Sequence, residues 1–337
     1  MRFKTSLYWS ALAFSLCAGV LTGCSSDKTV SAPAPADGSK PVAPAGRKFK
    51  IGVSVPAADH GWTAGVIYWA KKSMADNPDV EWTFATAENP DKQIKDLETM
   101  MVKGVDAIVV LATESAPLTP IAEQIHDRGI MLVNVDRGFL KPVADVLLEG
   151  DNVAFGRKSA EFMVDKLKGK GNIVILEGIP CTVNTARVDA FNEVVKKNPG
   201  IKVLDSQTGM WNKEKAMNLM QTYLLKHKQI DAVWAADDDM ALGAEQALKE
   251  AGRDKGVWIL GGAGMKDIVK RVMDGDAMFP GDITYPPAMI SQGIDEALKA
   301  LKAGQKGGSK EQRHVTIDVE LILPDNAKKF YFPDSIY

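Results

Sequence analysis

Cysteine is scarce in this chain, which has 337 residues and only three cysteines, at positions 17, 24 and 181. The first two fall in an amino-terminal segment with the features of an export signal, so Cys181 is the only thiol in the body of the protein. No intramolecular disulfide is then possible, and folding must depend on the hydrophobic core. A hydrophobic content of 45% in a chain of this length is enough for two domains.

An excess of positive charge is also absent. The formal net charge is −2, and acidic and basic residues are interspersed along the whole chain. The sequence therefore lacks a continuous basic face that could neutralise a phosphate backbone. We expect no nucleic-acid partner.

Motifs for catalysis and nucleotide binding are missing. The four histidines show no H-E-x-x-H spacing, and the chain contains neither a G-x-S-x-G elbow nor a G-x-x-x-x-G-K-[ST] loop. The glycine-rich turn at 261–264 has Asp267 where a dinucleotide motif needs its third glycine, and such turns more often serve close packing. These absences argue against an enzyme and against a cofactor.

A long membrane-spanning run is lacking, but a short apolar run opens the chain. Arg2 and Lys4 precede "LYWSALAFSLCAGVL", which is typical of a secretory signal. The run ends in "LTGC", which resembles the lipobox of bacterial lipoproteins, with Cys24 as the lipidated residue; an ordinary signal peptide is the alternative. We predict a signal peptide at 1–23 and, from its Ser, Ala, Pro and Gly content, a flexible tether at 24–48.

From residue 49 onwards, short apolar runs alternate with longer segments of helical periodicity. Runs such as "AIVVLA" and "NIVILE" are apolar throughout, as expected of strands covered by helices on both faces. Two such series, one before and one after about residue 150, exceed what a single doubly wound sheet needs. The sequence therefore predicts an α/β fold with two similar lobes built on parallel sheets.

Polar and aromatic residues gather just after the predicted strands, where open α/β sheets bind their ligands. The arginines offer planar donors, the carboxylates accept from hydroxyls, and the tryptophans can pack on the C–H faces of a sugar. Each residue alone could equally be a core aromatic, a solvated ion pair or a turn residue, but their shared placement favours a carbohydrate site. The candidate ligand-binding residues are Asp59, His60, Trp62, Asp136, Arg137, Arg187, Trp211 and Asp237.

Several long stretches then point to a known family. They are "IMLVNVDR", "GDNVAFGRKSAEFM", "TARVDAFNE", "SQTGMWNKEKAMNLMQTYL" and "AVWAADDDMALGAEQALKEAG", in the order that the family has them. From about residue 49 to 323 the chain resembles the type I periplasmic sugar-binding proteins of ABC importers, the group that includes the ribose-binding proteins. The resemblance implies two lobes joined by a three-crossover hinge, binding without turnover, and action as a monomer.

Residue roles follow from the same resemblance. It implies that Asp136 and Arg137 hold ring hydroxyls, that Arg187 is the arginine of R-x-x-x-F, and that Trp211 packs on the sugar. Asp237 opens the [ND]-D-x-M-A-x-G stretch, and Trp62 stands for the aromatic of the first loop, with Asp59 and His60 near its polar contact.

Departures from the pattern make ribose itself doubtful. Gly262, Ala263 and Gly264 stand where ribose-binding members have G-F-D-G, and Thr113 and Glu114 replace an asparagine after the third strand. Thr284 and Tyr285 lie near the place of a glutamine. Because a lost partner leaves a hydroxyl unpaired, the expected ligand is another pentose or hexose, or an open-chain polyol.

The crossovers are placed near Gly150, Thr284 and His314, which assigns 49–150 and 285–313 to one lobe and 151–284 and 314–337 to the other. We further expect the lobes to close on the ligand and the closed form to dock on an ABC permease. A lipid on Cys24 is expected to keep the protein beside the membrane. A sensory binding protein that signals to a chemoreceptor or kinase is the alternative. A hydrolase using Asp59 and Asp136, and a transcriptional regulator, are disfavoured.

The triplet of aspartates at 237–239 follows a predicted strand and opens a predicted helix. Adjacent residues at a helix start point in different directions, so we predict no metal site there. Asp237 is assigned to the ligand, whereas Asp238 and Asp239 are expected to cap the helix that runs through Glu245 and to complement its positive end.

Overall fold

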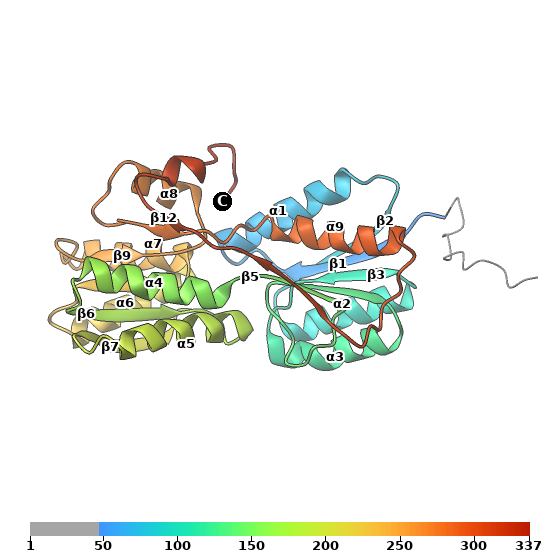
Figure 1. Cartoon of the computed structure of the whole chain (residues 1–337), viewed down its shortest axis with the longest axis horizontal. Coiled ribbons are helices and arrows are strands. Elements are labelled where there is room, and N and C mark those ends of the chain that lie inside the picture. The colour runs from blue at the N-terminus through green and yellow to red at the C-terminus, as the bar shows by residue number, and fades with distance from the viewer. Residues whose placement is uncertain (1–46) are drawn as a thin grey trace, which may run out of the picture. The chain divides into compact units, whose positions relative to one another are not determined.

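Two parallel β-sheets form the framework of the protein, which a computed structural model describes for residues 47–337 (Figure 1). These residues all belong to one compact unit. The predicted signal peptide and Cys24 lie outside the described residues.

The first sheet has six parallel strands in the order β11-β5-β4-β3-β1-β2. All residues of β3 and β4 are buried, because helices cover both faces of the sheet. The strands are β1 (Lys50–Pro56), β2 (Glu81–Ala87), β3 (Ala107–Val110), β4 (Met131–Val135), β5 (Val146–Gly150) and β11 (Arg313–Ile317).

Two pairs of helices cover this sheet on opposite faces (Figure 1). On one face lie α1 (Gly61–Ala75) and α9 (Met289–Lys302), and on the other lie α2 (Pro90–Val102) and α3 (Ser115–Asp127). Helix α9 comes from far along the chain, yet its apolar face packs on β3, β4 and β5. The first lobe is therefore completed by a segment that returns from the second lobe.

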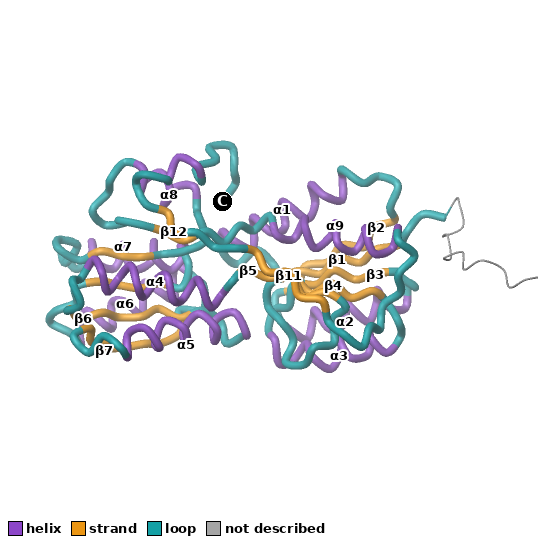
Figure 2. Tube along the Cα trace, viewed as in Figure 1, coloured by secondary structure: helices purple, strands orange, loops and turns teal. Residues whose placement is uncertain are grey.

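The second sheet has four parallel strands in the order β7-β6-β8-β9, and Figure 2 shows helices on both of its sides. Both lobes thus repeat the order 2-1-3-4 of a doubly wound sheet, and the predicted α/β class with two similar lobes is confirmed. The strands are β6 (Gly171–Glu177), β7 (Ile201–Thr208), β8 (Ala232–Ala235) and β9 (Trp258–Leu260). The helices are α4 (Asn152–Lys166), α5 (Thr182–Lys196), α6 (Lys213–Lys226), α7 (Asp238–Glu250) and α8 (Lys266–Met273), with the short 3-10 helix η1 (Ala327–Lys329).

Two glycines allow the helices of the second lobe to pack closely in pairs. A Cβ atom on Gly156 of α4 would lie 2.0 Å from the carbonyl oxygen of Arg187 in α5. A Cβ atom on Gly243 of α7 would lie 2.2 Å from the carbonyl oxygen of Lys213 in α6. Real Cβ atoms do not approach so closely, so this packing requires glycine at both positions. The two glycines thereby set the positions of α5, which carries Arg187, and of α7, which follows Asp237.

Three crossovers join the lobes. The first leaves β5 at Gly150, and the second leads from β10 (Asp282–Ile283) through 284–288 into α9. The third connects β11 to β12 (Leu321–Ile322), which pairs antiparallel with β10. All five residues of β11 pair with β5, so the last crossover begins after Ile317, whereas the sequence placed it near His314. The boundary expected at 313/314 falls inside a strand because strand pairing, and not the local sequence, decides where the chain leaves the sheet.

Candidate ligand-binding site

A cavity of about 290 Å³, which includes the solvent space at its opening, lies at the carboxyl ends of the strands, between residues of the two lobes. Seven of the eight residues predicted from the sequence line this cavity, so the structure brings together side chains from positions 60 to 237. Three further residues that were not in the predicted set also line it. The lining consists of His60, Trp62, Asp136, Arg137, Val183, Arg187, Trp211, Asp237, Ala263 and Tyr285.

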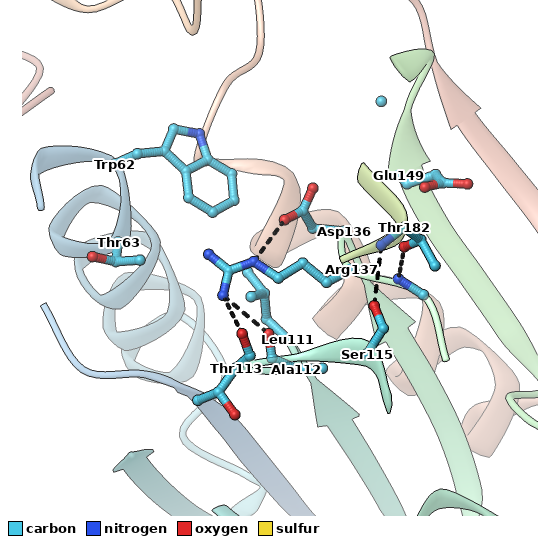
Figure 3. Close-up of polar contacts among 12 residues, drawn as sticks. Trp62, Thr63, Leu111, Ala112, Thr113, Ser115, Asp136, Arg137, Glu149 and Thr182 are labelled. Atoms are coloured by element: carbon cyan, nitrogen blue, oxygen red, sulfur yellow. Dashed lines mark hydrogen bonds and ion pairs between the residues drawn. The ribbon is translucent and has the colours of Figure 1, made fainter. Parts of the chain in front are cut away.

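Asp136 and Arg137 form the wall contributed by the first lobe (Figure 3). The Nη1 atom of Arg137 donates to the carbonyl oxygens of Ala112 and Thr113, at 3.2 and 2.8 Å, at the end of β3. Its Nε atom has no hydrogen bond within the described residues and lies 3.8 Å from Oδ2 of Asp136. Both side chains are buried, so their opposite charges compensate each other in the wall of the cavity.

Asp136 also has an unusual backbone conformation. Its φ angle is +66°, in the left-handed region that few residues other than glycine adopt. The conformation turns the chain sharply at the end of β4, where the amide of Asp136 donates to the carbonyl oxygen of Leu148 at 2.8 Å. Strain of this kind gathers at functional sites, and here it directs the carboxylate toward the cavity.

Arg187 is the main cation of the second-lobe wall. Its Nε atom donates to Oδ1 of Asn152 at 2.9 Å, and its Nη1 atom donates to the carbonyl oxygen of Ala236 at 2.7 Å. The guanidinium carbon lies 3.9 Å from the ring centroid of Phe155 and 4.2 Å from that of Tyr285. Two aromatic rings and two hydrogen bonds therefore hold a buried cation in place.

Trp62 and Trp211 supply the aromatic surface. The indole nitrogen of Trp62 donates to the carbonyl oxygen of Tyr285 at 2.9 Å, which fixes the ring of Trp62 beside the cavity. Trp211 has a φ angle of +51°, and the guanidinium carbon of Arg137 lies 4.8 Å from its ring centroid. The edge of Trp211 that carries its nitrogen packs on Gly178, so the ring offers the cavity an apolar face.

The three aspartates at 237–239 have three separate roles. Asp237 is the N-cap of α7, because its Oδ1 accepts from the amide of Met240 at 2.9 Å. Its Oδ2 is buried without a partner in the described part of the chain. Burial, together with the charge of Asp239, raises the pKa of Asp237 well above its usual value. This residue therefore offers the cavity a carboxyl oxygen that no protein group uses.

Asp238 and Asp239 lie in the first turn of α7, at its positive end as expected, but they do not cap it, because Asp237 is the N-cap. Asp238 accepts from the amides of Gly262 and Met265, both at 2.8 Å, and burial raises its pKa to about 7. Asp239 reaches across to the first lobe, where its Oδ1 accepts from the amide of Gly61 at 3.0 Å. One aspartate braces a loop of its own lobe, and the other satisfies the amino terminus of α1.

Asp59 is the predicted residue that does not line the cavity. Its carboxylate lies 2.6 Å from Nδ1 of His60 and accepts from Oγ1 of Thr63 at 3.1 Å. The side chain of Asp59 is 56% exposed, whereas that of His60 is buried and faces the cavity. Asp59 thus orients the imidazole ring from behind.

Further contacts join the lobes beside the cavity (Figure 3). The amide of Gly138 donates to Oγ1 of Thr182 at 2.9 Å, and the amide of Thr182 donates to Oγ of Ser115 at 3.2 Å. With the contact of Asp239 to Gly61, polar bonds connect the two lobes at separate points around the cavity. The lobes are therefore in a closed arrangement.

Among the residues missed by sequence analysis, Tyr285 makes the most polar contacts. The sequence marked it only as a departure from the ribose-binding pattern, because it comes from a crossover far along the chain. Val183 and Ala263 are apolar and carry no chemical signal of their own.

Within residues 47–337, no cluster of three potential metal-ligating side chains occurs. In the same part of the chain, no helix is long and apolar enough to cross a membrane. Cys181 is a buried free thiol at the start of α5.

Comparison with known proteins assigns the chain to a family. Residues 51–306 match the periplasmic binding protein domain. The chain is 30% identical to the galactofuranose-binding protein of Escherichia coli over 290 residues, which cover 83% of this chain and 89% of that protein. It is 35% identical to the xylitol-binding protein of Mycolicibacterium smegmatis over 229 residues, which cover 67% of this chain and 65% of that protein.

A solved structure agrees with this assignment. The fructose-binding periplasmic domain of a hybrid two-component system is 28% identical and superposes with a TM-score of 0.75, covering 84% of this chain and 93% of that one. The chain belongs to the type I periplasmic sugar-binding proteins of ABC importers. The family is extracytoplasmic, and its members bind and transport sugars.

Proposed function

We propose that this protein binds an uncharged monosaccharide or polyol between its two lobes and delivers it to the permease of an ABC importer. The observation that carries the proposal is the set of unused polar atoms in a cavity with aromatic walls. Oδ2 of Asp237 needs a donor and Nε of Arg137 needs an acceptor, and both are buried. A hydroxyl group both donates and accepts, so a polyhydroxylated ligand can satisfy both atoms. Each buried polar group that is left unpaired costs roughly 1–3 kcal/mol.

The aromatic and charged walls support the same class of ligand. Trp62 and the face of Trp211 can pack on the C–H groups of a sugar, while Arg187 and Asp136 can bind hydroxyls at its edge. The two related proteins named for galactofuranose and xylitol bind a furanose sugar and a five-carbon polyol, as their names state. Together these support a polyhydroxylated ligand.

The proposed mechanism is closure of the lobes about the three crossovers. In the ligand-free protein the contacts of Asp239 with Gly61 and of Thr182 with Gly138 would open, and the cavity would become accessible. Ligand binding brings Asp237 and Arg187 of one lobe against Asp136 and Arg137 of the other, and the closed form docks on the permease.

The proposal includes attachment to the membrane. A lipid on Cys24 and the tether at 24–48 would keep the binding domain, a monomer, beside its permease. Mass spectrometry of the purified protein tests this point, because a Cys24→Ala variant should lose the acyl mass and leave the membrane fraction.

Isothermal titration calorimetry tests the binding proposal. We expect one saturable site for a member of a panel of pentoses, hexoses, pentitols and hexitols. Size-matched compounds without hydroxyl groups, such as leucine and hexanoate, should not bind. Absence of binding across the whole panel contradicts the proposal, and recovery of unchanged ligand after long incubation separates binding from hydrolysis.

A sensory role is the second candidate function. It is favoured by the likeness to the fructose-binding periplasmic domain of a hybrid two-component system. The two roles differ in the partner that reads the closed form. Co-purification from membranes with ligand present should recover a permease under the first proposal and a receptor or kinase under the second.

A further inference from the structure

Tyr285 lies in the second crossover, beside the cavity. It contacts Asp136 at the end of β4, Gly150 at the first crossover and Trp62 of α1. Its hydroxyl donates to Oδ1 of Asp136 at 2.5 Å and accepts from the amide of Gly150, the last residue before the first crossover, at 3.4 Å. Its carbonyl oxygen accepts from the indole nitrogen of Trp62. The residue is 3% exposed, so all of these contacts are made in the interior.

The ring of Tyr285 has a second task. It packs against the guanidinium of Arg187, with its centroid 4.2 Å from the guanidinium carbon, and the ring of Phe155, nearly perpendicular to it, packs against the same guanidinium at 3.9 Å. A Cβ atom on Gly150 would lie only 2.1 Å from the ring, so the ring packs directly on the first crossover. The position of Tyr285 is therefore set by close packing and not by its hydroxyl alone.

The hydroxyl of Tyr285 changes what Asp136 can do for a ligand. A free carboxylate can bind two neighbouring hydroxyls of a sugar, one with each oxygen. Here Oδ1 is already used by Tyr285, and the other oxygen, Oδ2, lies near Arg137. Of the two oxygens of Asp136, only Oδ2 is then without a hydrogen bond from the described residues.

We propose that Tyr285 determines specificity by restricting Asp136 to a single ligand hydroxyl, so that the site gains little from a second, vicinal hydroxyl at this point. The inference rests on the proposed function, because it concerns the ligand of the same cavity. It makes Tyr285 a positioning residue that acts through Asp136, with its ring supporting Arg187 in all ligand complexes.

Matched pairs of a sugar and its deoxy analogue test this inference. The pairs are D-ribose and 2-deoxy-D-ribose, D-glucose and 2-deoxy-D-glucose, and D-glucose and 3-deoxy-D-glucose, of which only the first member of each has the complete vicinal pair of hydroxyls. The measured quantity is the ratio of the two dissociation constants within a pair, for the wild type and for Tyr285→Phe. Phenylalanine keeps the ring under Arg187 and removes only the hydroxyl.

The Tyr285→Phe variant should shift the ratio by about five- to tenfold toward the first member of whichever pair the protein binds, since Oδ1 of Asp136 becomes free for one more charge-assisted hydrogen bond. Phe155→Leu is the control, because it removes the other ring beside Arg187 and leaves the hydroxyl of Tyr285 in place. This variant should weaken both members of a pair alike.

The outcomes separate the two proposals. An unchanged ratio in Tyr285→Phe, with both affinities lowered alike, assigns Tyr285 a merely structural role and overturns the inference. A wild type that binds no member of any pair, nor any other sugar or polyol, contradicts the proposed function itself. Thermal unfolding without ligand identifies a folding defect, which would shift the melting temperature but not the ratio.

Discussion

Asp136 and Asp237 contribute one carboxyl group to the cavity from each lobe, and both follow a buried strand of a parallel sheet. Their surroundings differ. Asp136 is held by the hydroxyl of Tyr285 and lies beside Arg137, in a left-handed backbone conformation. Asp237 has extended backbone, caps its own helix with one oxygen and leaves the other unpaired.

The contrast shows how one site uses two kinds of carboxyl group. Asp136 belongs to a network that spans the first lobe and a crossover, so it is compensated before any ligand arrives. Asp237 is buried with an unused oxygen and with a pKa raised by burial, which costs free energy until a ligand hydroxyl donates to it. One carboxyl group thus has protein partners before binding, whereas the other has an oxygen that finds its partner in the ligand.

Replacing Asp136 with asparagine should have the largest effect. The change leaves the buried guanidinium of Arg137 without its neighbouring charge, and loss of one partner of a buried pair costs about 3–5 kcal/mol. We expect affinity to fall by about a hundredfold or more and the melting temperature to fall as well. Calorimetry and thermal unfolding measure the two effects, and a variant with wild-type values in both would refute the role given to this residue.

Asp237→Ser is the matching change in the second lobe. Serine is a good N-cap, so the start of α7 should be kept while the unpaired carboxyl oxygen is lost. Affinity should fall by about ten- to hundredfold with little change in the melting temperature, because the loss concerns a single hydrogen bond to ligand. Asp237→Ala is the control, and it should lose stability as well as affinity.

The Glu149→Gln variant tests the charge beside Asp136. Burial, followed by the charge of Asp136, raises the pKa of Glu149 from 4.5 to about 7, while Asn152 and Arg187 lower it and Asp151 raises it. Nε2 of His314 lies 3.0 Å from its carboxylate. Because the folded protein binds this proton more tightly, the stability that Glu149 contributes is complete below pH 4.5 and is lost as the pH rises through 7.

Glutamine removes that titration. The variant should gain stability relative to the wild type as the pH rises from 4.5 to 7, by on the order of 1–2 kcal/mol after screening by solvent. Denaturant unfolding at a series of pH values measures the difference. A difference that does not change with pH would mean that the proton on Glu149 does not matter to the fold.

Asp239→Ala should have the smallest effect and acts on closure. It removes the acceptor that the second lobe offers to the amides of Gly61 and Trp62, at 3.0 and 3.4 Å. We expect affinity to fall by about three- to fivefold, because the lost contact is comparable in free energy to a helix cap. Faster ligand release should account for most of the change. Asp239→Asn keeps an acceptor and is the control. Stopped-flow release measured by tryptophan fluorescence distinguishes the two variants, and equal rates would show that the contact does not hold the lobes together.

Much of the fold follows from local pattern. Runs such as "AIVVLA" are apolar throughout because both faces of a parallel sheet are covered, and that property is visible without coordinates. Strand ends were also informative, since they led to Asp136, Arg137 and Asp237, which all line the cavity. Local pattern does not specify where β11 ends, because its pairing with β5 extends beyond the boundary expected near His314.

The sequence reveals only part of the candidate site, because only some of its residues have distinctive chemistry. Residues with distinctive chemistry, such as Trp62, Arg187 and Trp211, stood out in the sequence, whereas Val183 and Ala263 did not. Tyr285 was noticed as a departure but was not assigned to the site, because its contacts with Asp136 and Gly150 join residues more than a hundred positions apart. Asp239 was expected to cap its own helix, and instead it caps α1 of the other lobe.

By itself, the sequence determined the two α/β lobes, the order of their strands and helices, and the residue types available to a sugar, because these depend on periodicity and on positions close in the chain. The tertiary structure alone decided how those side chains share their hydrogen bonds. Tyr285 takes an oxygen of Asp136, and Asp239 satisfies a helix in the other lobe, while Asp237 keeps an unpaired oxygen. Hydrogen bonds depend on distance and direction in space, and the local sequence does not specify these for residues that meet across lobes.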